Sequence, residues 1–212
     1  MRYAIRLGLT GLLLTMAVPL HAAVETVTDL QREWALVTYE LSPEMKADAL
    51  ASLGEQADSL VEQHPDDPEL LIWQGIVLSS YAGEAGGLGA LGAAKRARAA
   101  LERALEIDPA AMSGSALTSL GTLYHKVPGW PVGFGSDKKA REYLSRALQI
   151  NADGIDPNYF MGEFLFDEGE YAAAEQYLRK ALAAPDRPGR ELADRGRRGE
   201  IQALLGRVEA KL

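Results

Sequence analysis

Few residues of this chain are spaced for catalysis. The chain has 212 residues with three histidines and no cysteine. His64 precedes Pro65, His125 ends a helical stretch, and neither begins an H-E-x-x-H zinc motif. A catalytic centre would be sought at His125, Lys126 and Glu163, but no G-x-S-x-G or comparable nucleophile motif accompanies them. The sequence therefore predicts a protein that is not an enzyme and has no metal site.

A glycine-rich segment at residues 87–92 reads G-L-G-A-L-G and so matches the letters of the G-x-G-x-x-G dinucleotide motif. That motif binds a pyrophosphate only where it joins a strand to a helix. Here the segment lies between two helical stretches, and the chain has no G-x-x-x-x-G-K-S/T motif. We therefore expect no cofactor, and we interpret the segment as a flexible turn.

A second unusual segment, residues 125–135, contains two prolines and three glycines that interrupt any helix, and it carries Trp130 and Phe134. Two interpretations remain open. The two aromatic side chains could fold back over the neighbouring helices as local core, or they could form a surface for a ligand or partner, because aromatic residues are enriched at contact centres.

Charge and composition exclude several classes of protein. The chain has 22 basic and 30 acidic residues, a net charge of −8, and 47% apolar residues. It is too apolar for a disordered chain and too acidic for a nucleic-acid binder, which would carry a basic stripe. Five arginines near the C-terminus are interleaved with acidic residues, which predicts that they pair internally; they are Arg187, Arg190, Arg195, Arg197 and Arg198.

The N-terminus has the pattern of a secretory signal peptide. Arg2 and Arg6 precede an uncharged apolar run, residues 7–20, which small residues follow up to Ala23. We predict that residues 1–23 are removed, that no membrane span remains, and that the mature chain enters the periplasm. An exported chain without cysteine suits that compartment, and it cannot be a lipoprotein.

Internal repeats determine the expected fold. Residues 81–109 align with residues 124–152 without a gap, and a third partial copy follows 34 residues later. The shared pattern A-x3-L-x2-A-L places its residues on one face of a helix. Gly121 and Gly162, inside the preceding helical stretches, predict close helix crossings because glycine otherwise destabilises a helix. No segment has a strand period, so we predict an all-α protein.

This pattern resembles the tetratricopeptide repeat. The residues that carry the resemblance are Leu117, Leu120, Gly121, Tyr124, Ala140, Leu144 and Ala147 in the middle copy, and Gly162, Gly169, Tyr171, Ala174, Leu178 and Ala181 in the last. The resemblance implies a short right-handed solenoid of helical hairpins with repeats at about 68–110, 111–152 and 153–186. We expect residues 24–67 to form a divergent leading helix pair and residues 187–212 a capping helix.

The resemblance also implies a binding surface. Members of the family bind protein partners on the concave side, and the positions that correspond here are Thr118, Thr122, His125, Lys126, Tyr159, Glu163 and Phe166. Tyr81 precedes Ala97 by sixteen residues, as Tyr124 precedes Ala140, against nine in the family. We therefore expect two long turns of equal length between the paired helices.

Residues 133–140, G-F-G-S-D-K-K-A, resemble more narrowly the T-component of tripartite ATP-independent periplasmic (TRAP) transporters. This resemblance implies that the partner is another envelope protein, a periplasmic solute-binding protein, and it leaves a homo-oligomer open. The alternative function is binding of a small apolar or carboxylate ligand by the loop at residues 125–135.

Overall fold

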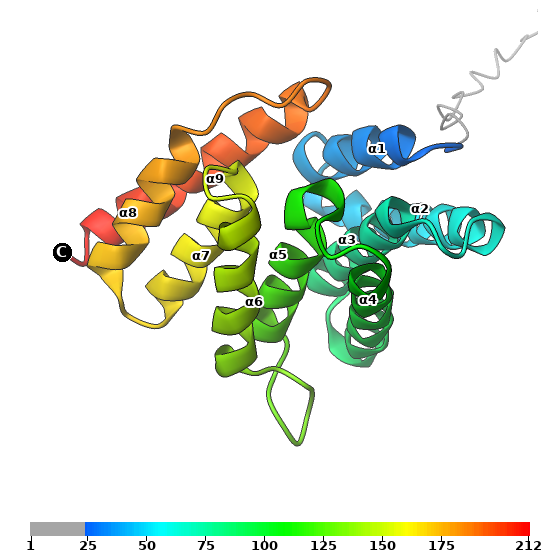
Figure 1. Ribbon diagram of the computed structural model, residues 1–212, viewed down its shortest axis with the longest axis horizontal. Helices are drawn as coiled ribbons and strands as arrows, with labels where there is room; N and C mark the ends of the chain where they lie inside the picture. The colour runs from blue at the N-terminus through cyan, green and yellow to red at the C-terminus, as the bar shows by residue number, and fades with distance from the viewer. Residues whose placement is uncertain (1–23) are drawn as a thin grey trace, which may run out of the picture.

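The computed structural model describes residues 24–212, and these residues form nine α-helices without a β-strand (Figure 1). The all-α prediction is confirmed. The predicted signal peptide, residues 1–23, lies outside the described residues. The helices are α1 (Val27–Tyr39), α2 (Pro43–Gln63), α3 (Pro68–Ala85), α4 (Gly87–Ile107), α5 (Ala111–Lys126), α6 (Asp137–Ile150), α7 (Ile155–Asp167), α8 (Tyr171–Leu182) and α9 (Glu191–Glu209).

Three helix pairs, α3–α4, α5–α6 and α7–α8, pack most closely and form the successive hairpins of a solenoid. The periodic pattern seen in the sequence accounts for this packing. Its first three positions are completely buried in every copy; they are Ala97, Leu101 and Ala104 in α4, Ala140, Leu144 and Ala147 in α6, and Ala174, Leu178 and Ala181 in α8. The small alanines let the helices approach, and the leucines fill the remaining space.

A glycine faces the buried leucine across each of the three pairs. A Cβ atom added to Gly121 would lie 2.6 Å from Leu144 Cγ, and one added to Gly162 would lie 2.7 Å from Leu178 Cγ. The predicted close crossings are therefore present. The first pair repeats the contact with Gly75 and Leu101. Gly75 lies three residues farther from Leu101 in the chain than Gly121 does from Leu144, a difference close to one helical turn.

The prediction of two long turns is wrong for the first pair. Only Gly86, with φ of +62°, separates α3 from α4, and residues 87–92 form the beginning of α4. The extra residues lengthen both helices instead of the turn, because Ala93 and Ala94 at the start of α4 are buried. Between α5 and α6, in contrast, residues 127–136 form a loop.

The N-terminal end of α5 contains a left-handed turn. Met112, Ser113 and Gly114 all have positive φ, and regular α5 geometry begins after them. Residues other than glycine rarely adopt this backbone conformation, because their Cβ atom makes it unfavourable. The turn lets Gly114 lie against the Ile150 side chain at the end of α6.

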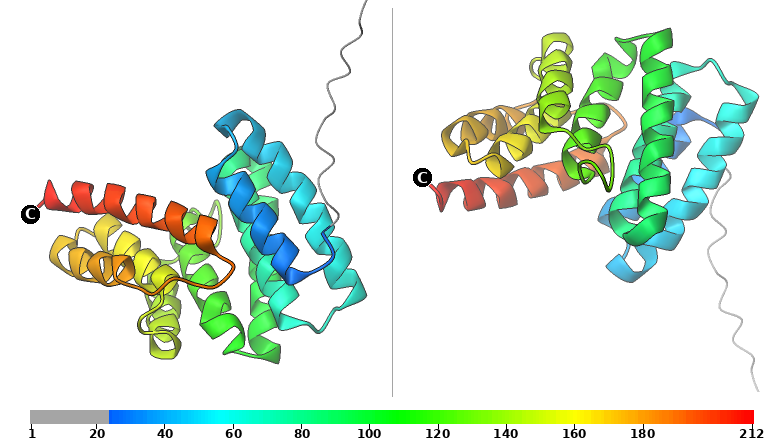
Figure 2. Two further views of the ribbon diagram at one scale, coloured as in Figure 1. Left: turned by 90° about the horizontal axis from the view of Figure 1, so that it is seen from above. Right: turned by 90° about the horizontal axis from the view of Figure 1, so that it is seen from below.

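The last helix of the described chain meets the first. Helix α9 packs against α7 and α8, and its first turns contact α1 (Figures 1 and 2). Gly196 of α9 lies directly under the Tyr39 ring of α1, where a Cβ atom would have no room. The leading pair therefore belongs to a second apolar cluster around Trp34 and Trp73, to which Ala193 of α9 contributes. The solenoid curves until α9 closes it against α1.

The close crossings can be tested with Gly162→Ala. Alanine favours a helix by about 1 kcal/mol over glycine, but a methyl group here would collide with Leu178. We expect the substitution to lower the free energy of unfolding by about 1–2 kcal/mol, since overpacking outweighs helix propensity. Gly199→Ala in α9, where the added Cβ meets open space, is the control and should raise stability. Urea unfolding followed by circular dichroism measures both; equal stability gains in the two variants would contradict the close crossing.

Candidate functional site

A cavity of about 760 Å³ lies inside the curve of the solenoid. Its walls come from α1, α3, α4, α5, the start of α7, the loop after α5, the segment before α9, and α9 itself. The closure of α9 against α1 therefore creates one of its walls. This volume lies in the range of sites that hold small molecules.

Most of the cavity wall is apolar or aromatic. Trp34, Trp73 and Phe160 line one end, and aliphatic side chains such as Leu91 and Val127 line the other. Four of the serine and threonine hydroxyls on the wall already donate to their own helices. These hydrogen bonds run from Ser79 to Gly75 O (2.7 Å), from Ser80 to Ile76 O (2.9 Å), from Ser115 to Met112 O (2.7 Å) and from Thr122 to Thr118 O (3.0 Å).

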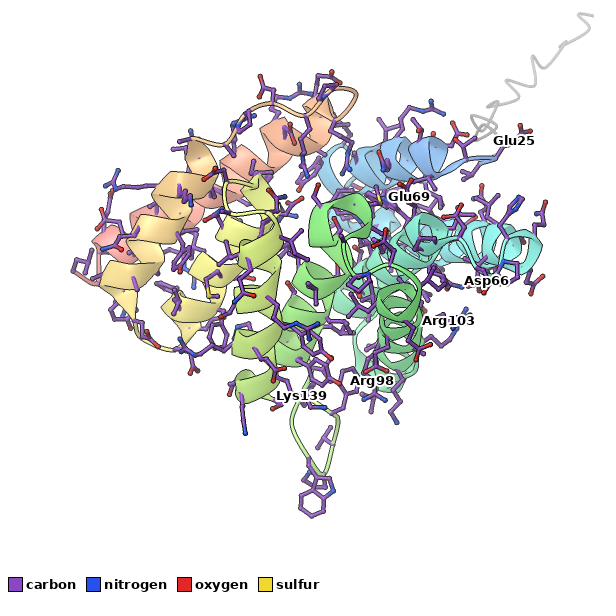
Figure 3. The ribbon with its side chains drawn as sticks, viewed as in Figure 1. Glu25, Asp66, Glu69, Arg98, Arg103 and Lys139 are labelled. Carbon is purple, nitrogen blue, oxygen red and sulfur yellow. The ribbon has the colours of Figure 1, made fainter. Side chains whose placement is uncertain are left out.

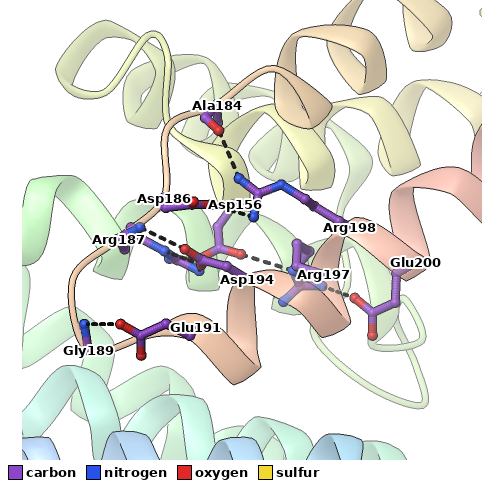
Figure 4. A network of polar contacts seen from close by, with 10 residues as sticks. All are labelled: Asp156, Ala184, Asp186, Arg187, Gly189, Glu191, Asp194, Arg197, Arg198 and Glu200. Carbon is purple, nitrogen blue, oxygen red and sulfur yellow. Dashed lines mark hydrogen bonds and ion pairs between the residues drawn. The ribbon is translucent and has the colours of Figure 1, made fainter.

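An arginine–carboxylate network forms the polar end of the cavity (Figure 4). Asp156 at the start of α7 accepts from Arg187 Nη1 at 2.6 Å and from Arg197 Nε at 2.9 Å. Arg187 also donates to buried Asp194, and Arg197 Nη1 donates to Glu200 Oε2 at 2.5 Å. The network therefore ties α7 and α9 together through the segment that joins α8 to α9.

The network sets the charge states of its members. Burial acts against the charge of Asp156, but Arg197 and Arg187 outweigh it and hold its pKa below the ordinary value. Burial raises the pKa of Glu200, although Arg197 acts in the opposite direction. Burial also raises the pKa of Tyr39, at the same end of the cavity, to about 12. The two arginines therefore keep Asp156 ionised despite its burial.

The predicted internal pairing is confirmed for Arg187, Arg197 and Arg198. Arg195 forms a longer ion pair, with 3.9 Å between its Nη2 atom and Glu40 Oε1. The prediction is wrong for Arg190. Within residues 24–212, the Arg190 side chain forms no ion pair, and its buried Nε atom has no hydrogen-bond partner. Its guanidinium lies 4.9 Å from the centre of the Trp73 ring. The acids nearest to it are taken by the other arginines.

Two further buried polar atoms at this end of the cavity have no partner among the described residues. They are Trp73 Nε1 and Thr38 Oγ1. Trp34 Nε1, in contrast, donates to Ser80 Oγ at 2.8 Å. Buried polar groups in native proteins are nearly always paired, so unpaired ones call for an explanation such as a bound ligand.

Of the predicted concave residues, Thr118, Thr122 and Lys126 line the cavity. His125, Lys126 and Glu163 do lie together, joined by an acid that the sequence analysis missed. Asp167 accepts from His125 Nε2 at 2.9 Å and from Lys126 Nζ at 3.0 Å, and Lys126 Nζ lies 3.2 Å from Glu163 Oε1. This group connects α5 to α7 by ion pairs.

The last repeat places its predicted residues differently. Tyr159 is buried under the Arg197 guanidinium, 4.6 Å from its ring, and its neighbour Phe160 lines the cavity instead. Phe166 packs against Tyr171, and the Arg207 guanidinium covers its ring. Asp156, which the sequence analysis also missed, carries no distinguishing sequence signal beyond its place at the start of a helix.

The two aromatic residues of the loop after α5 have different environments: one packs as local core, and the other is exposed as a contact surface would be. Phe134 folds back, with its ring edge-on to Tyr124 at 5.5 Å and the Arg98 guanidinium 4.4 Å above it. Trp130, in the middle of the loop, is 89% exposed, and Val132 near it is 66% exposed. One aromatic residue anchors the loop, while the other points into solvent.

The loop backbone is closely packed. Gly135 N donates to Pro128 O at 3.0 Å, and Gly133 N donates to Gly129 O at 3.0 Å. A Cβ atom at Gly135 would collide with Val127 O, and one at Gly133 with Pro128 O. The two glycines thus allow the two arms of the loop to touch. Val127, Pro128 and Val132 also line the cavity, so the loop forms part of its wall.

Within the described part of the chain, no group of three or more metal-ligating side chains is placed to hold a metal ion. Among the same residues, no helix has the length and apolar character to cross a bilayer.

Comparisons with known proteins agree with this geometry. The family model described as tetratricopeptide repeat matches residues 155–185, which are α7, α8 and their immediate flanks. Residues 155–185 are therefore similar to a tetratricopeptide repeat. The crystal structure of a thermophilic tetratricopeptide-repeat protein from Thermus thermophilus is similar over 84% of this chain and 89% of that chain, with a TM-score of 0.54 and 20% identity. At that identity the likeness shows the fold alone: a tetratricopeptide-repeat solenoid. No match was found among curated proteins.

The importance of Asp156 can be tested with Asp156→Asn. The change leaves Arg187 and Arg197 partly buried without their shared acid, and we expect a loss of about 3 kcal/mol at pH 7. Because the pKa of Asp156 is lowered in the folded protein, its contribution is present above the ordinary value of 3.8 and is lost as the pH falls through the lowered pKa. The difference from wild type should therefore shrink towards pH 3 in urea unfolding. Asp186→Asn, at an exposed acid paired with Arg198, is the control and should cost less than about 1 kcal/mol.

The division of the loop aromatics predicts opposite effects of two alanine substitutions. Phe134→Ala should lower the free energy of unfolding by about 2 kcal/mol, because it removes the contacts with Tyr124 and Arg98. Trp130→Ala should change it by less than about 0.5 kcal/mol, because the side chain is exposed. Thermal unfolding of both variants measures this difference, and a comparable loss in both would show that Trp130 also belongs to the core.

Proposed function

We propose that this chain is a non-enzymatic scaffold, exported to the periplasm, that binds another envelope protein through the loop at residues 127–136. The observation that carries the proposal is Trp130, whose side chain is 89% exposed in the middle of that loop. Tryptophan is strongly enriched among residues that dominate binding energy in protein interfaces. The tetratricopeptide-repeat fold supports the coarser statement that the partner is a protein.

The rigidity of the loop favours binding. Phe134 holds the loop on α4 and α5, and the glycine contacts and backbone hydrogen bonds hold its two arms together. A side chain presented on an already ordered segment loses little further conformational freedom on association. Trp130 and Val132 therefore form an apolar protrusion suited to insertion into a pocket.

The base of the loop suggests the chemistry of the partner. Arg98 and Lys139 lie there, each over an aromatic ring (Figure 3). The adjacent Lys138 is exposed. An apolar protrusion with cations at its base complements an apolar pocket with an acidic rim, since complementary charges guide association. We propose a partner surface of that kind.

The narrower resemblance of residues 133–140 to the TRAP T-component supports a more specific partner. These residues form the second half of the loop and the first turn of α6, next to the exposed tryptophan. On that resemblance we propose a periplasmic solute-binding protein as the partner. The proposed location rests on the signal-peptide pattern of residues 1–23.

A second candidate function is supported by a different observation. The cavity is suited to a small molecule, because buried polar atoms at its wall have no partner in the described part of the chain. The loop at residues 125–135 contributes to its wall through Val127, Pro128 and Val132. Both functions can belong to one protein, because Trp130 does not line the cavity.

Site-specific photo-crosslinking in cells tests the scaffold proposal. A benzoylphenylalanine placed at Trp130 should give one discrete adduct with a heavier envelope protein. The same group placed at Met45, an exposed apolar position on α2, should not. Trp130→Ala should abolish co-purification of that protein while leaving unfolding unchanged. Equal adducts from both positions, or none from position 130, would contradict the proposal, and an adduct with a second copy of the chain would replace it by self-association.

A further inference from the structure

We propose that the cavity binds a small amphipathic monocarboxylate, whose carboxylate pairs with Arg190 and whose apolar body lies between α3, α4 and α5. This inference is independent of the scaffold proposal, because it uses no exposed residue of the loop. It rests on the charges, hydrogen bonds and walls of the cavity itself.

Arg190 provides the anchor. Its buried Nε atom has no hydrogen-bond partner within residues 24–212, although two carboxylates, Asp156 and Asp194, act on its charge. Asp156 and Asp194 are engaged by Arg187, and Arg197 shares Asp156. A guanidinium remains charged in proteins, and its charge is unfavourable where the side chain is partly buried without a counterion, as at Arg190. An external carboxylate would supply the missing counterion.

The geometry around Arg190 suits a carboxylate in particular. The guanidinium lies 4.9 Å above the Trp73 ring, and such stacking holds the planar donor fork in one orientation. A fork of two parallel N–H groups matches the two oxygens of a carboxylate. Trp73 Nε1 and Thr38 Oγ1 line the same end of the cavity without partners among the described residues, so they supply two further donors for an anion.

The neighbouring acids restrict the ligand to a single negative charge. Asp156 and Glu200 line the same end of the cavity, and they would repel a second anionic group. At the far end Lys126 is already paired with Glu163 and Asp167. Among the residues that the structure describes, the cavity therefore offers one unpaired cation, which disfavours dicarboxylates and phosphates with two charges.

The remaining wall determines the body of the ligand. Ile76, Leu91, Leu123 and Val127 form an apolar surface. The hydroxyls of Ser79, Ser80, Ser115 and Thr122 already donate to backbone carbonyls, and so they offer no donors to the many acceptors of a sugar. An acyl or aromatic body removes the most water from such a wall. We therefore expect a medium-chain fatty acid or an arylalkanoate.

Tryptophan fluorescence gives a direct test. The chain has three tryptophans, and Trp34 and Trp73 both line the cavity. In a Trp130→Phe background, emission therefore reports on the cavity alone. Titration with decanoate, decanamide and decylammonium compares one body with three head groups. We expect decanoate to bind at least about tenfold more tightly than either of the others, as a charge-assisted pair does.

Three substitutions locate the ligand. Arg190→Gln should weaken decanoate binding by about tenfold or more, whereas Arg195→Gln, at an exposed arginine of the same cluster, should leave it unchanged. Gly83→Leu adds a side chain to the cavity wall where a Cβ meets no other atom, so it should block binding while the protein stays folded. Circular dichroism and thermal unfolding confirm folding of each variant.

Several results would overturn the proposal. Equal affinity for the three head groups would remove the role of the carboxylate, and unchanged binding in Arg190→Gln would remove its anchor. Unchanged binding in Gly83→Leu would place the ligand outside the cavity. Binding of a peptide with a free C-terminal carboxylate, without binding of decanoate, would assign the cavity to a protein segment instead. Loss of partner crosslinking from position 130 has no bearing on these results, so the two proposals fail separately.

Discussion

The contact between a glycine and a leucine across each helix pair is the constraint on which the rest of the structure depends. Gly75, Gly121 and Gly162 leave no room for a side chain, so the paired helices approach closely enough to bury Leu101, Leu144 and Leu178 completely. Buried apolar surface of this kind is the main source of stability in a solenoid, where each unit contacts only its neighbours. The spacing of the hairpins, and hence the curve of the array, follows from these contacts.

The curve brings together charges that are far apart in the sequence. Helix α9 closes against α1, and Asp156 then lies between Arg187 and Arg197. An ion-pair network of this size needs every member paired, because unpaired buried charges are destabilising. Within residues 24–212, Arg190 is the exception in this network, and it lies beside unpaired donors at the wall of a cavity. A single arginine without an acid, beside a network whose other arginines are paired, is the basis for proposing a binding site at Arg190.

Two segments of equal length fold differently. The segment between α5 and α6 forms a loop, whereas the corresponding segment between α3 and α4 is almost entirely helical. Both intervals have the same number of residues between Tyr and Ala. Prolines and closely packed glycines keep residues 127–136 out of a helix, whereas residues 87–92 lack proline and extend α4, whose early alanines find a buried position. As a result, only the connection between α5 and α6 presents a long loop, and that loop carries the exposed Trp130.

The sequence by itself determined the all-α class and the three recurring buried positions, because a helix of period 3.6 displays its apolar residues in the linear order of the chain. It also indicated the crossings at Gly121 and Gly162 and the special character of residues 125–135. Only the tertiary structure decided that Phe134 is core and Trp130 is exposed, that Asp156 and Asp167 complete ion-pair groups, and that Arg190 is left without an acid. Those outcomes depend on distances between residues that are far apart in the sequence, which are set by the packing and curvature of the whole array and leave no local pattern in the sequence.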